Sequence, residues 1–143
     1  MKERLAKTLR APVDGKPIYL GFQSTEVDIP SIAQQVYFHF VFEPPHGDGC
    51  FQLLFRSAVF RGYIWGTNTY WSPNGRMLVA EWTGPFDERI GRTVVIIDLL
   101  SWQWIEARGF QVMSIDDYGI YGKDVGGNVA SMDFSQQVDW NAA

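Results

Sequence analysis

The chain has 143 residues, a net charge of −4 and a single cysteine, Cys50. This length fits one domain that buries a core without crosslinks, and 46% hydrophobic against 20% charged residues excludes a disordered chain. The lone cysteine excludes an internal disulfide and a four-thiolate zinc site. No segment approaches the roughly 18 consecutive apolar residues that span a bilayer, and the N-terminus lacks the apolar block of a secretory signal. We therefore expect a cytoplasmic protein that does not enter a membrane.

The charge is unevenly distributed along the chain. Residues 81–143 carry ten acidic and four basic side chains, whereas residues 1–80 carry six acidic and eight basic ones. An acidic half argues against binding nucleic acid, whose phosphates need cations. It suits a protein partner with a basic surface, since complementary potentials speed encounter. The other interpretation is that these acids only keep an aromatic-rich chain soluble.

The N-terminal third contains short elements separated by prolines and glycines. Residues 1–10 are expected to form a short helical turn or to remain frayed, because Pro12 interrupts any longer helix, and the frayed segment is expected to cover residues 1–12. Ile18–Gln23 is predicted as the first strand, and Ser31–Gln35 as a brief helical turn.

The clearest strand pattern covers Gln35–Glu43. Its alternation places four apolar side chains on the face expected to point inward, namely Val36, Phe38, Phe40 and Phe42. After a loop rich in proline and glycine, Cys50–Ser57 returns as the second arm of a hairpin. Val59–Trp65 is a further predicted strand, which we expect to end at residues 66–69.

The segment Tyr70–Trp104 is the one around which the rest is organised. Pro73 presets φ near about −65°, and the Asn-Gly pair after it tolerates positive φ, so a tight turn is predicted. Arg76–Trp82 then runs as a strand. Thr93–Leu100 is almost wholly apolar, rich in β-branched residues and too short for a helix, which predicts a strand buried on both faces.

The C-terminal part is also predicted to be β-structure. Strand character continues through Ile105–Ala107, and Gln111–Ile115 and Gly119–Gly122 are predicted to pair as a hairpin that turns at residues 116–118. Val129–Phe134 is the last predicted strand.

Taken together, these patterns predict one all-β, antiparallel domain over residues 1–143, either a sandwich or open blade-like sheets. We expect about eight to ten short strands with little helix. Residues 136–143 are expected to form a polar tail.

One block resembles a known repeat. Trp71-Ser72-Pro73-Asn74-Gly75-Arg76, followed by Met77–Ala80, resembles the inner hairpin of a β-propeller blade of the WD-repeat or TolB type. In those blades a W-S-P-D-G-R-x-L-A element leads into a strand that ends in an aspartate, and Val94–Leu99 matches that strand with Asp98. The block occurs once, and the chain has room for about three blades, whereas propellers close with roughly four to eight. The resemblance therefore implies a blade-like hairpin and not a complete propeller.

A longer pattern extends from this block, with W-S-P-N-G-R-x-L-x-x-x-W, a polar loop, an apolar strand and a final Tyr-Gly hairpin. In this overall character the chain is similar to small bacterial immunity proteins of polymorphic or contact-delivered toxin systems. The resemblance implies a protein without a catalytic motif that binds a cognate toxin. It assigns no binding residues.

The most suggestive group for chemistry is His46, Asp48 and Cys50. An imidazole, a carboxylate and a thiol so close in sequence are able to ligate a metal or to pair a nucleophile with a base. No further ligand spacing accompanies them, so we favour a hairpin loop in which Cys50 begins a strand as a small apolar residue. His39 is interpreted as a hydrogen-bonded structural residue. We predict no metal and no cofactor.

Carboxylate pairs offer a second route to chemistry, glycoside hydrolysis. The candidates are Glu81, Asp87, Glu88, Asp98, Asp116 and Asp117. The alternative is that these acids do structural work, because aspartate commonly caps the backbone of turns. Neither a phosphate loop nor a G-x-S-x-G elbow is present. The sequence therefore predicts no catalytic residue and a protein that is not an enzyme.

The aromatic residues give the strongest signal for binding. Trp102 and Trp104 share one face of their strand, and with Trp82, Phe86 and Tyr118 they are candidates for an exposed patch beside acidic side chains. The alternative is core packing, since large aromatics dominate cores. The predicted partner-binding residues are Glu81, Phe86, Asp87, Glu88, Trp102, Trp104, Asp116, Asp117 and Tyr118.

Three functions remain as hypotheses. The first is a non-enzymatic protein-binding module, most specifically an immunity protein that neutralises a cognate bacterial toxin by occluding a basic active site. The second is a β domain that binds a carbohydrate or another small ligand through stacked aromatics and carboxylates. The third is a hydrolase that uses a carboxylate pair.

Overall fold

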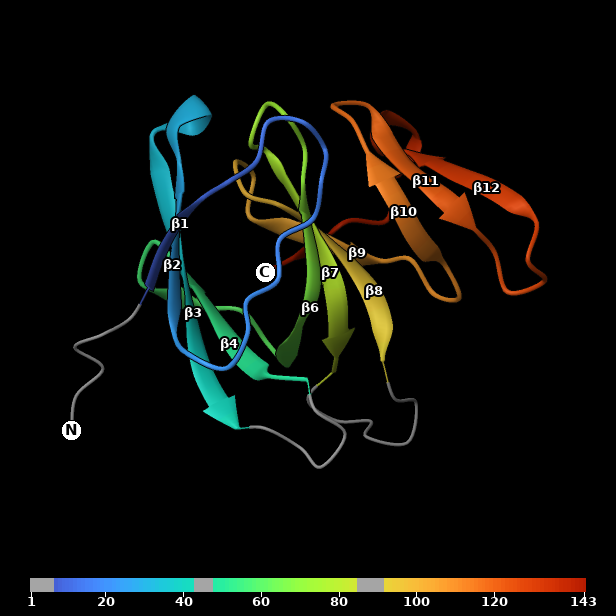
Figure 1. The fold of residues 1–143 in the computed structure, drawn as a ribbon. Coiled ribbons are helices and arrows are strands. Elements are labelled where there is room, and N and C mark those ends of the chain that lie inside the picture. Colours follow the sequence, from blue (N-terminus) through green and yellow to red (C-terminus); the bar gives the residue numbers. More distant parts are fainter. Residues whose placement is uncertain (1–6, 43–47, 85–91) are drawn as a thin grey trace.

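The computed structural model describes residues 7–42, 48–84 and 92–143 and arranges them in two β-sheets (Figure 1). Two short 3-10 turns are the helical elements of this part of the chain, so the predicted all-β fold class is confirmed. In chain order the elements are β1 (Lys7–Arg10), β2 (Thr25–Ile29), η1 (Pro30–Ile32), β3 (Gln34–Phe42), β4 (Cys50–Phe55), β5 (Ala58–Val59), β6 (Tyr63–Trp71), β7 (Met77–Thr83), β8 (Thr93–Asp98), β9 (Gln103–Glu106), β10 (Gln111–Ile115), β11 (Gly119–Lys123), β12 (Val129–Asp133), η2 (Phe134–Gln136) and β13 (Asn141–Ala142).

The larger sheet has the strand order β1-β2-β3-β4-β6-β7-β8-β9-β13, with β5 paired to β4. β1 and β2 are parallel neighbours, and the remaining neighbours are antiparallel. The connection from β1 to β2 passes along β6, where Ile18 and Thr69 exchange backbone hydrogen bonds of 2.9 Å. This connection supplies backbone hydrogen-bond partners to the part of β6 that does not pair with β4.

Aromatic side chains fill the interior of the larger sheet. Trp71 is fully buried, and Phe38 packs edge-on against it with ring centroids 6.1 Å apart. Farther along the same core, Trp82 and Trp104 lie 5.1 Å apart, and Phe60 packs against both. Burying aromatics of this size contributes a large share of core stability.

The smaller sheet, in the order β10-β11-β12, packs on the outer face of the larger one (Figure 1). A second apolar cluster joins them, in which Val79 and Ile96 of the larger sheet meet Ile120 and Phe134. The alternate residues of β8, such as Val95, belong to the first core. β8 is therefore buried on both faces, which confirms the interpretation of its unbroken apolar run.

The N-terminal predictions were wrong in part. Lys7–Arg10 forms an edge strand and not a helical turn, and the half-buried alternation of Thr25–Ile29 forms β2, which the sequence analysis did not identify. Ile18–Gln23 contributes one isolated bridge and no strand. Among the described strands, β1 is an edge strand that pairs only with β2, so its local pattern is weak.

Three further differences come from irregular pairing. Residues 66–68 form a bulge inside one continuous strand β6, because the register with β7 shifts between Trp65 and Thr69. A similar shift next to Phe42 turns that side chain outward, to 45% exposure. The expected tail contains β13, whose pairing with β9 holds the segment against the larger sheet. Within the described ranges no helix is long and apolar enough to cross a membrane.

Candidate functional site

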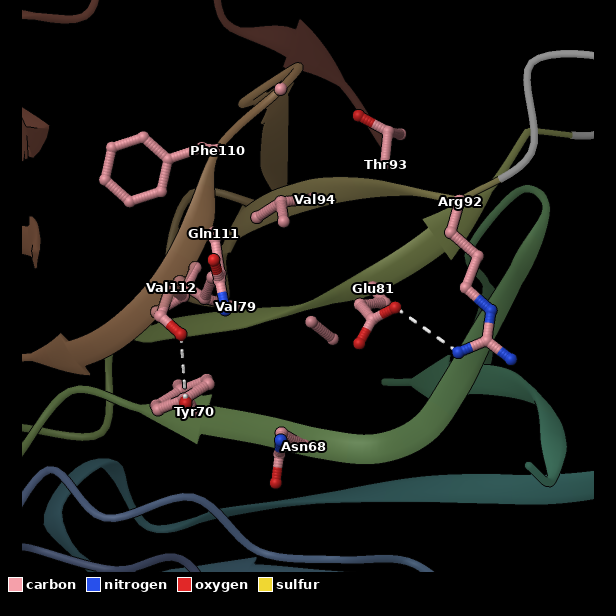
Figure 2. A pocket seen from close by; sticks show the side chains of 12 residues that line it. Asn68, Tyr70, Val79, Glu81, Arg92, Thr93, Val94, Phe110, Gln111 and Val112 are labelled. Carbon is pink, nitrogen blue, oxygen red and sulfur yellow. Dashed lines mark hydrogen bonds and ion pairs between the residues drawn. The ribbon is translucent and has the colours of Figure 1, made fainter. Parts of the chain in front are cut away.

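A cleft of about 320 Å³ opens between the outer face of the larger sheet and the first strand of the smaller one (Figure 2). Tyr70 fixes the spacing of its walls, because its hydroxyl donates to the backbone oxygen of Val112 at 3.2 Å. Phe110 and Gln111 continue the wall on the side of β10. The residues that line the cleft are Asn68, Tyr70, Val79, Ala80, Glu81, Arg92, Thr93, Val94, Gly109, Phe110, Gln111 and Val112.

Charged side chains stand at the end of the cleft opposite Phe110 (Figure 2). The guanidinium of Arg92 lies 2.7 Å from Asp48 and 3.3 Å from Glu81, and it stacks 4.0 Å above the ring of Trp65. Burial and the nearby charge of Glu81 both raise the pKa of Tyr70 above its ordinary value.

Cys50 lies near this charged group but carries no reactive thiolate. Its side chain is buried, and burial raises the pKa of the thiol to about 11 although the charge of Arg92 opposes the shift. Asp48 is committed to the ion pair with Arg92, and His46 lies outside the described residues. Among the residues that the structure describes, no group of three potential ligands is arranged to hold a metal ion.

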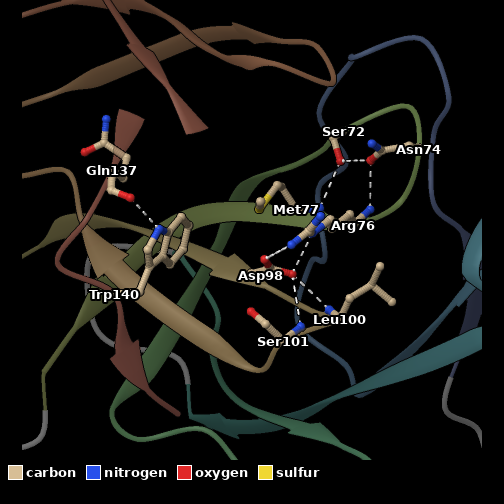
Figure 3. Close-up of polar contacts among 9 residues, drawn as sticks. All are labelled: Ser72, Asn74, Arg76, Met77, Asp98, Leu100, Ser101, Gln137 and Trp140. Carbon is tan, nitrogen blue, oxygen red and sulfur yellow. Dashed lines mark hydrogen bonds and ion pairs between the residues drawn. The ribbon is translucent and has the colours of Figure 1, made fainter. Parts of the chain in front are cut away.

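A second polar network lies at the other end of the seam between the sheets, in the Trp71–Arg76 turn (Figure 3). Ser72 Oγ donates to Asn74 Oδ1 at 2.7 Å and accepts from the backbone N–H of Met77 at 2.9 Å. Gly75 has φ 79°, as the predicted turn requires. The backbone N–H of Arg76 donates back to Asn74 Oδ1 at 3.0 Å, which closes the turn.

Asp98 links this turn to the next one. It receives a two-pronged contact from Arg76, with Nη2 at 2.7 Å and Nε at 3.0 Å, and its Oδ1 accepts from the backbone N–H groups of Leu100 and Ser101 (Figure 3). Burial raises the pKa of Asp98, but the hydrogen bonds and charge of Arg76 and the bonds from Ser101 outweigh it and hold the pKa below its usual value. Asp98, the aspartate of the blade-like block, is therefore a structural residue that caps the backbone N–H groups of the turn after β8.

The β10–β11 hairpin displays Tyr118 at its turn with 75% of the residue exposed. Asp116 Oδ1 accepts from the backbone N–H groups of Tyr118 and Gly119 at 2.8 and 3.0 Å, and Phe134 donates to the carbonyl of Tyr118. Asp117 Oδ1 accepts from the N–H of Asn74 at 2.7 Å and so ties the hairpin to the larger sheet. We call residues 116–119 the Tyr118 turn.

Further acidic charge surrounds this turn. The pKa of Tyr121 is raised by its hydrogen bond to Asp116, by burial and by the charges of Asp116 and Asp133. The Tyr121 hydroxyl donates to Asp116 Oδ2 at 2.8 Å. Residues 111–133, the smaller sheet and its turns, contain four aspartates and one lysine, a net charge of −3 within a chain of −4.

The predicted partner-binding residues do not form one patch. Trp104 is 8% exposed and packs in the core, and Trp102 packs on the same core with its ring 5.2 Å from Phe55. The exposed aromatic patch predicted for Trp82, Trp102 and Trp104 is therefore wrong for these residues, and core packing is the correct alternative.

The remaining predicted residues divide between two places. Glu81 lies at the charged end of the cleft, and Asp116, Asp117 and Tyr118 lie together at the Tyr118 turn. Phe86, Asp87 and Glu88 fall in residues 85–91, outside the described residues.

Apart from Glu81, sequence reasoning missed the residues that line the cleft. Arg92, Tyr70 and Phe110 come from three segments that meet only when the smaller sheet folds back on the larger one. One local signal pointed to Arg92. It directly precedes the buried strand β8, and a charged side chain at the end of a buried strand needs a partner of opposite charge.

A scan against protein-family models found no match for this chain. Searches of the curated proteins and of the solved structures likewise found no match.

Proposed function

We propose that this chain is a non-enzymatic protein-binding module, an immunity protein that neutralises a cognate bacterial toxin by occluding a basic active-site cleft. The observation that carries the proposal is the Tyr118 turn. An exposed tyrosine stands among carboxylates on a backbone that three hydrogen bonds already hold.

Such a turn has the properties of an interface anchor. Tyrosine is enriched among the residues that dominate binding energy, and an ordered backbone lowers the entropy cost of association. The acids around Tyr118 match a partner of opposite sign and exclude partners of like sign. The excess of aspartates in residues 109–143 extends the same potential over the smaller sheet.

Co-expression with the toxin encoded beside its gene tests this function. We expect growth rescue, copurification of the two proteins, and an association rate that falls steeply as salt rises. Tyr118→Ala should weaken the complex about tenfold or more. The matched control is Tyr19→Ala, which removes a tyrosine that is 52% exposed in the connection from β1 to β2. If the wild-type chain neither rescues growth nor forms a complex with the toxin, the proposal is contradicted.

The cleft favours a second candidate function, the binding of a small ligand. Its volume of about 320 Å³ lies at the lower end of the range for small-molecule sites. Carbohydrate stacking on Trp82 or Trp104 is not available, because both are buried. A thermal-shift screen of small ligands separates the two functions, since a ligand that binds the native state raises the unfolding temperature without any partner protein.

A further inference from the structure

We propose that the cleft between the two sheets is a receptor for one guanidinium group on an aliphatic stem, the side chain of an arginine. The proposal rests on the function proposed above for the source of that arginine, the basic partner protein. The chemistry of the cleft stands on separate observations.

The first observation is an unbalanced charge. Arg92 is the cation among the residues that line the cleft, and two carboxylates contact it. The contact with Asp48 is 2.7 Å, whereas the contact with Glu81 is 3.3 Å and uses Oε1. The contact described for Glu81 uses Oε1 alone, and Asp48, Glu81 and Arg92 together carry a net charge of −1, although Asp48 lies outside the lining of the cleft. A second cation would neutralise these three described side chains.

The second observation is that both terminal nitrogens of Arg92 already have partners. Its Nη1 lies 3.3 Å from Glu81 and 3.5 Å from Thr67 Oγ1, and its Nη2 lies 2.7 Å from Asp48. Trp65 covers the guanidinium plane. An incoming carboxylate or phosphate would have to displace these contacts and would meet the charge of Glu81.

The third observation is the shape and lining of the remaining space. Val79 and Val94 are buried beneath the cleft, and Phe110, Val112 and Tyr70 form the wall opposite the charged end (Figure 2). An aliphatic stem with a charged head matches such a surface, because the methylenes lie on apolar groups while the head reaches a carboxylate.

Arginine fits this lining better than lysine. A guanidinium is planar, stacks on aromatic faces and forms two parallel hydrogen bonds to a carboxylate, whereas an ammonium is a compact and strongly hydrated point charge. The ring of Tyr70 is held in place by its bond to Val112 and lines the cleft with 9% of the residue exposed. The side-chain amide of Asn68 also lines the cleft and supplies a neutral acceptor.

The test is a titration of the full chain with N-acetyl-arginine amide, followed by amide chemical shifts in NMR spectra. We expect saturable shifts at Glu81, Val94 and Val112 with a dissociation constant near about 1 mM, the range of single-contact ligands. N-acetyl-lysine amide should bind more weakly, and N-acetyl-norleucine amide and N-acetyl-glutamate amide should give no saturable shift there.

Two variants locate the site. Glu81→Gln should weaken the arginine probe about fivefold, whereas Glu106→Gln, an equal charge change at a carboxylate that pairs with Arg108 outside the cleft, should leave its affinity unchanged. Gln111→Trp places a large ring on an exposed lining position and should block the probe without disturbing the core. Unchanged spectra of residues far from the cleft show that each variant is folded.

The outcomes divide cleanly. Saturable binding that Glu81→Gln and Gln111→Trp both weaken supports the proposal, and weaker binding of the toxin to the same two variants identifies the partner as the source of the arginine. Binding of the amide without any effect of these variants on the toxin assigns the cleft to free guanidinium compounds. No saturable shift, or equal affinity for the glutamate probe, overturns the proposal. Absence of a toxin leaves the titration unaffected, so failure of the proposed function and failure of the receptor are distinguishable.

Discussion

The two ends of the seam between the sheets differ in how completely their carboxylates are hydrogen-bonded and how far they are exposed. At the Trp71–Arg76 turn, the Asp98 carboxylate accepts hydrogen bonds from Arg76, Leu100 and Ser101, and the residue is 4% exposed. At the cleft, Glu81 has one loose contact and its side chain is 35% exposed. A buried carboxylate whose bonds are all made holds the fold together, whereas one with a loose contact in an open cleft is able to bind something else.

Asp98→Ala is expected to have the largest effect of the substitutions that probe this difference. It leaves Arg76 without its carboxylate and removes the acceptor of the Leu100 and Ser101 N–H groups. We expect a loss of about 3 kcal/mol in the free energy of unfolding, measured by urea denaturation. A loss below about 1 kcal/mol would show that the turn network is not structural.

The pH dependence of the same group has a definite sign. Because the folded-state pKa of Asp98 is lowered, its contribution is present above the unfolded pKa and is lost as the pH falls below it. The stability difference between the wild type and Asp98→Ala should therefore be constant above about pH 5 and shrink below about pH 4. A difference that grows on acidification contradicts the assignment.

Thr93→Val tests the cleft end of the seam with a smaller expected effect. The Thr93 hydroxyl is buried without a hydrogen-bond partner among the described residues, and valine keeps the branched shape at a site that pairs with Trp82. We expect a gain of about 1 kcal/mol in the free energy of unfolding, because the desolvation penalty disappears. A measured loss would mean that this hydroxyl is bonded in solution.

Glu81→Gln is expected to change stability least, by under about 0.5 kcal/mol, since a partly exposed ion pair contributes little. Equilibrium denaturation of this variant beside Glu106→Gln provides the comparison. A loss as large as that of Asp98→Ala would make Glu81 a structural residue and would remove the contrast between the two ends of the seam.

Local patterns were sufficient for the strands of the central segment. β7 and β8 were predicted within a residue or two, because β8 carries an unbroken β-branched run and the turn before β7 needs a proline and a glycine. The turn role of Asp116 was also predictable, since aspartate caps backbone N–H groups two or three residues ahead. In contrast, alternation did not reveal the bulge in β6, whose register depends on β4, β7 and the crossing segment.

The sequence by itself determined the all-β class, the doubly buried strand and the tight turn before it, because each depends on side-chain size and backbone freedom within a few residues. Only the tertiary structure decided that Trp82 and Trp104 are core residues and that Arg92 meets Asp48 and Glu81. Aromatic residues pack equally well inside or at an interface, and charges from distant strands pair only once the strand order is set. The folding of the smaller sheet over β6–β8 decided which side chains line the cleft, and Glu81 among them makes its described contact with Arg92 at 3.3 Å.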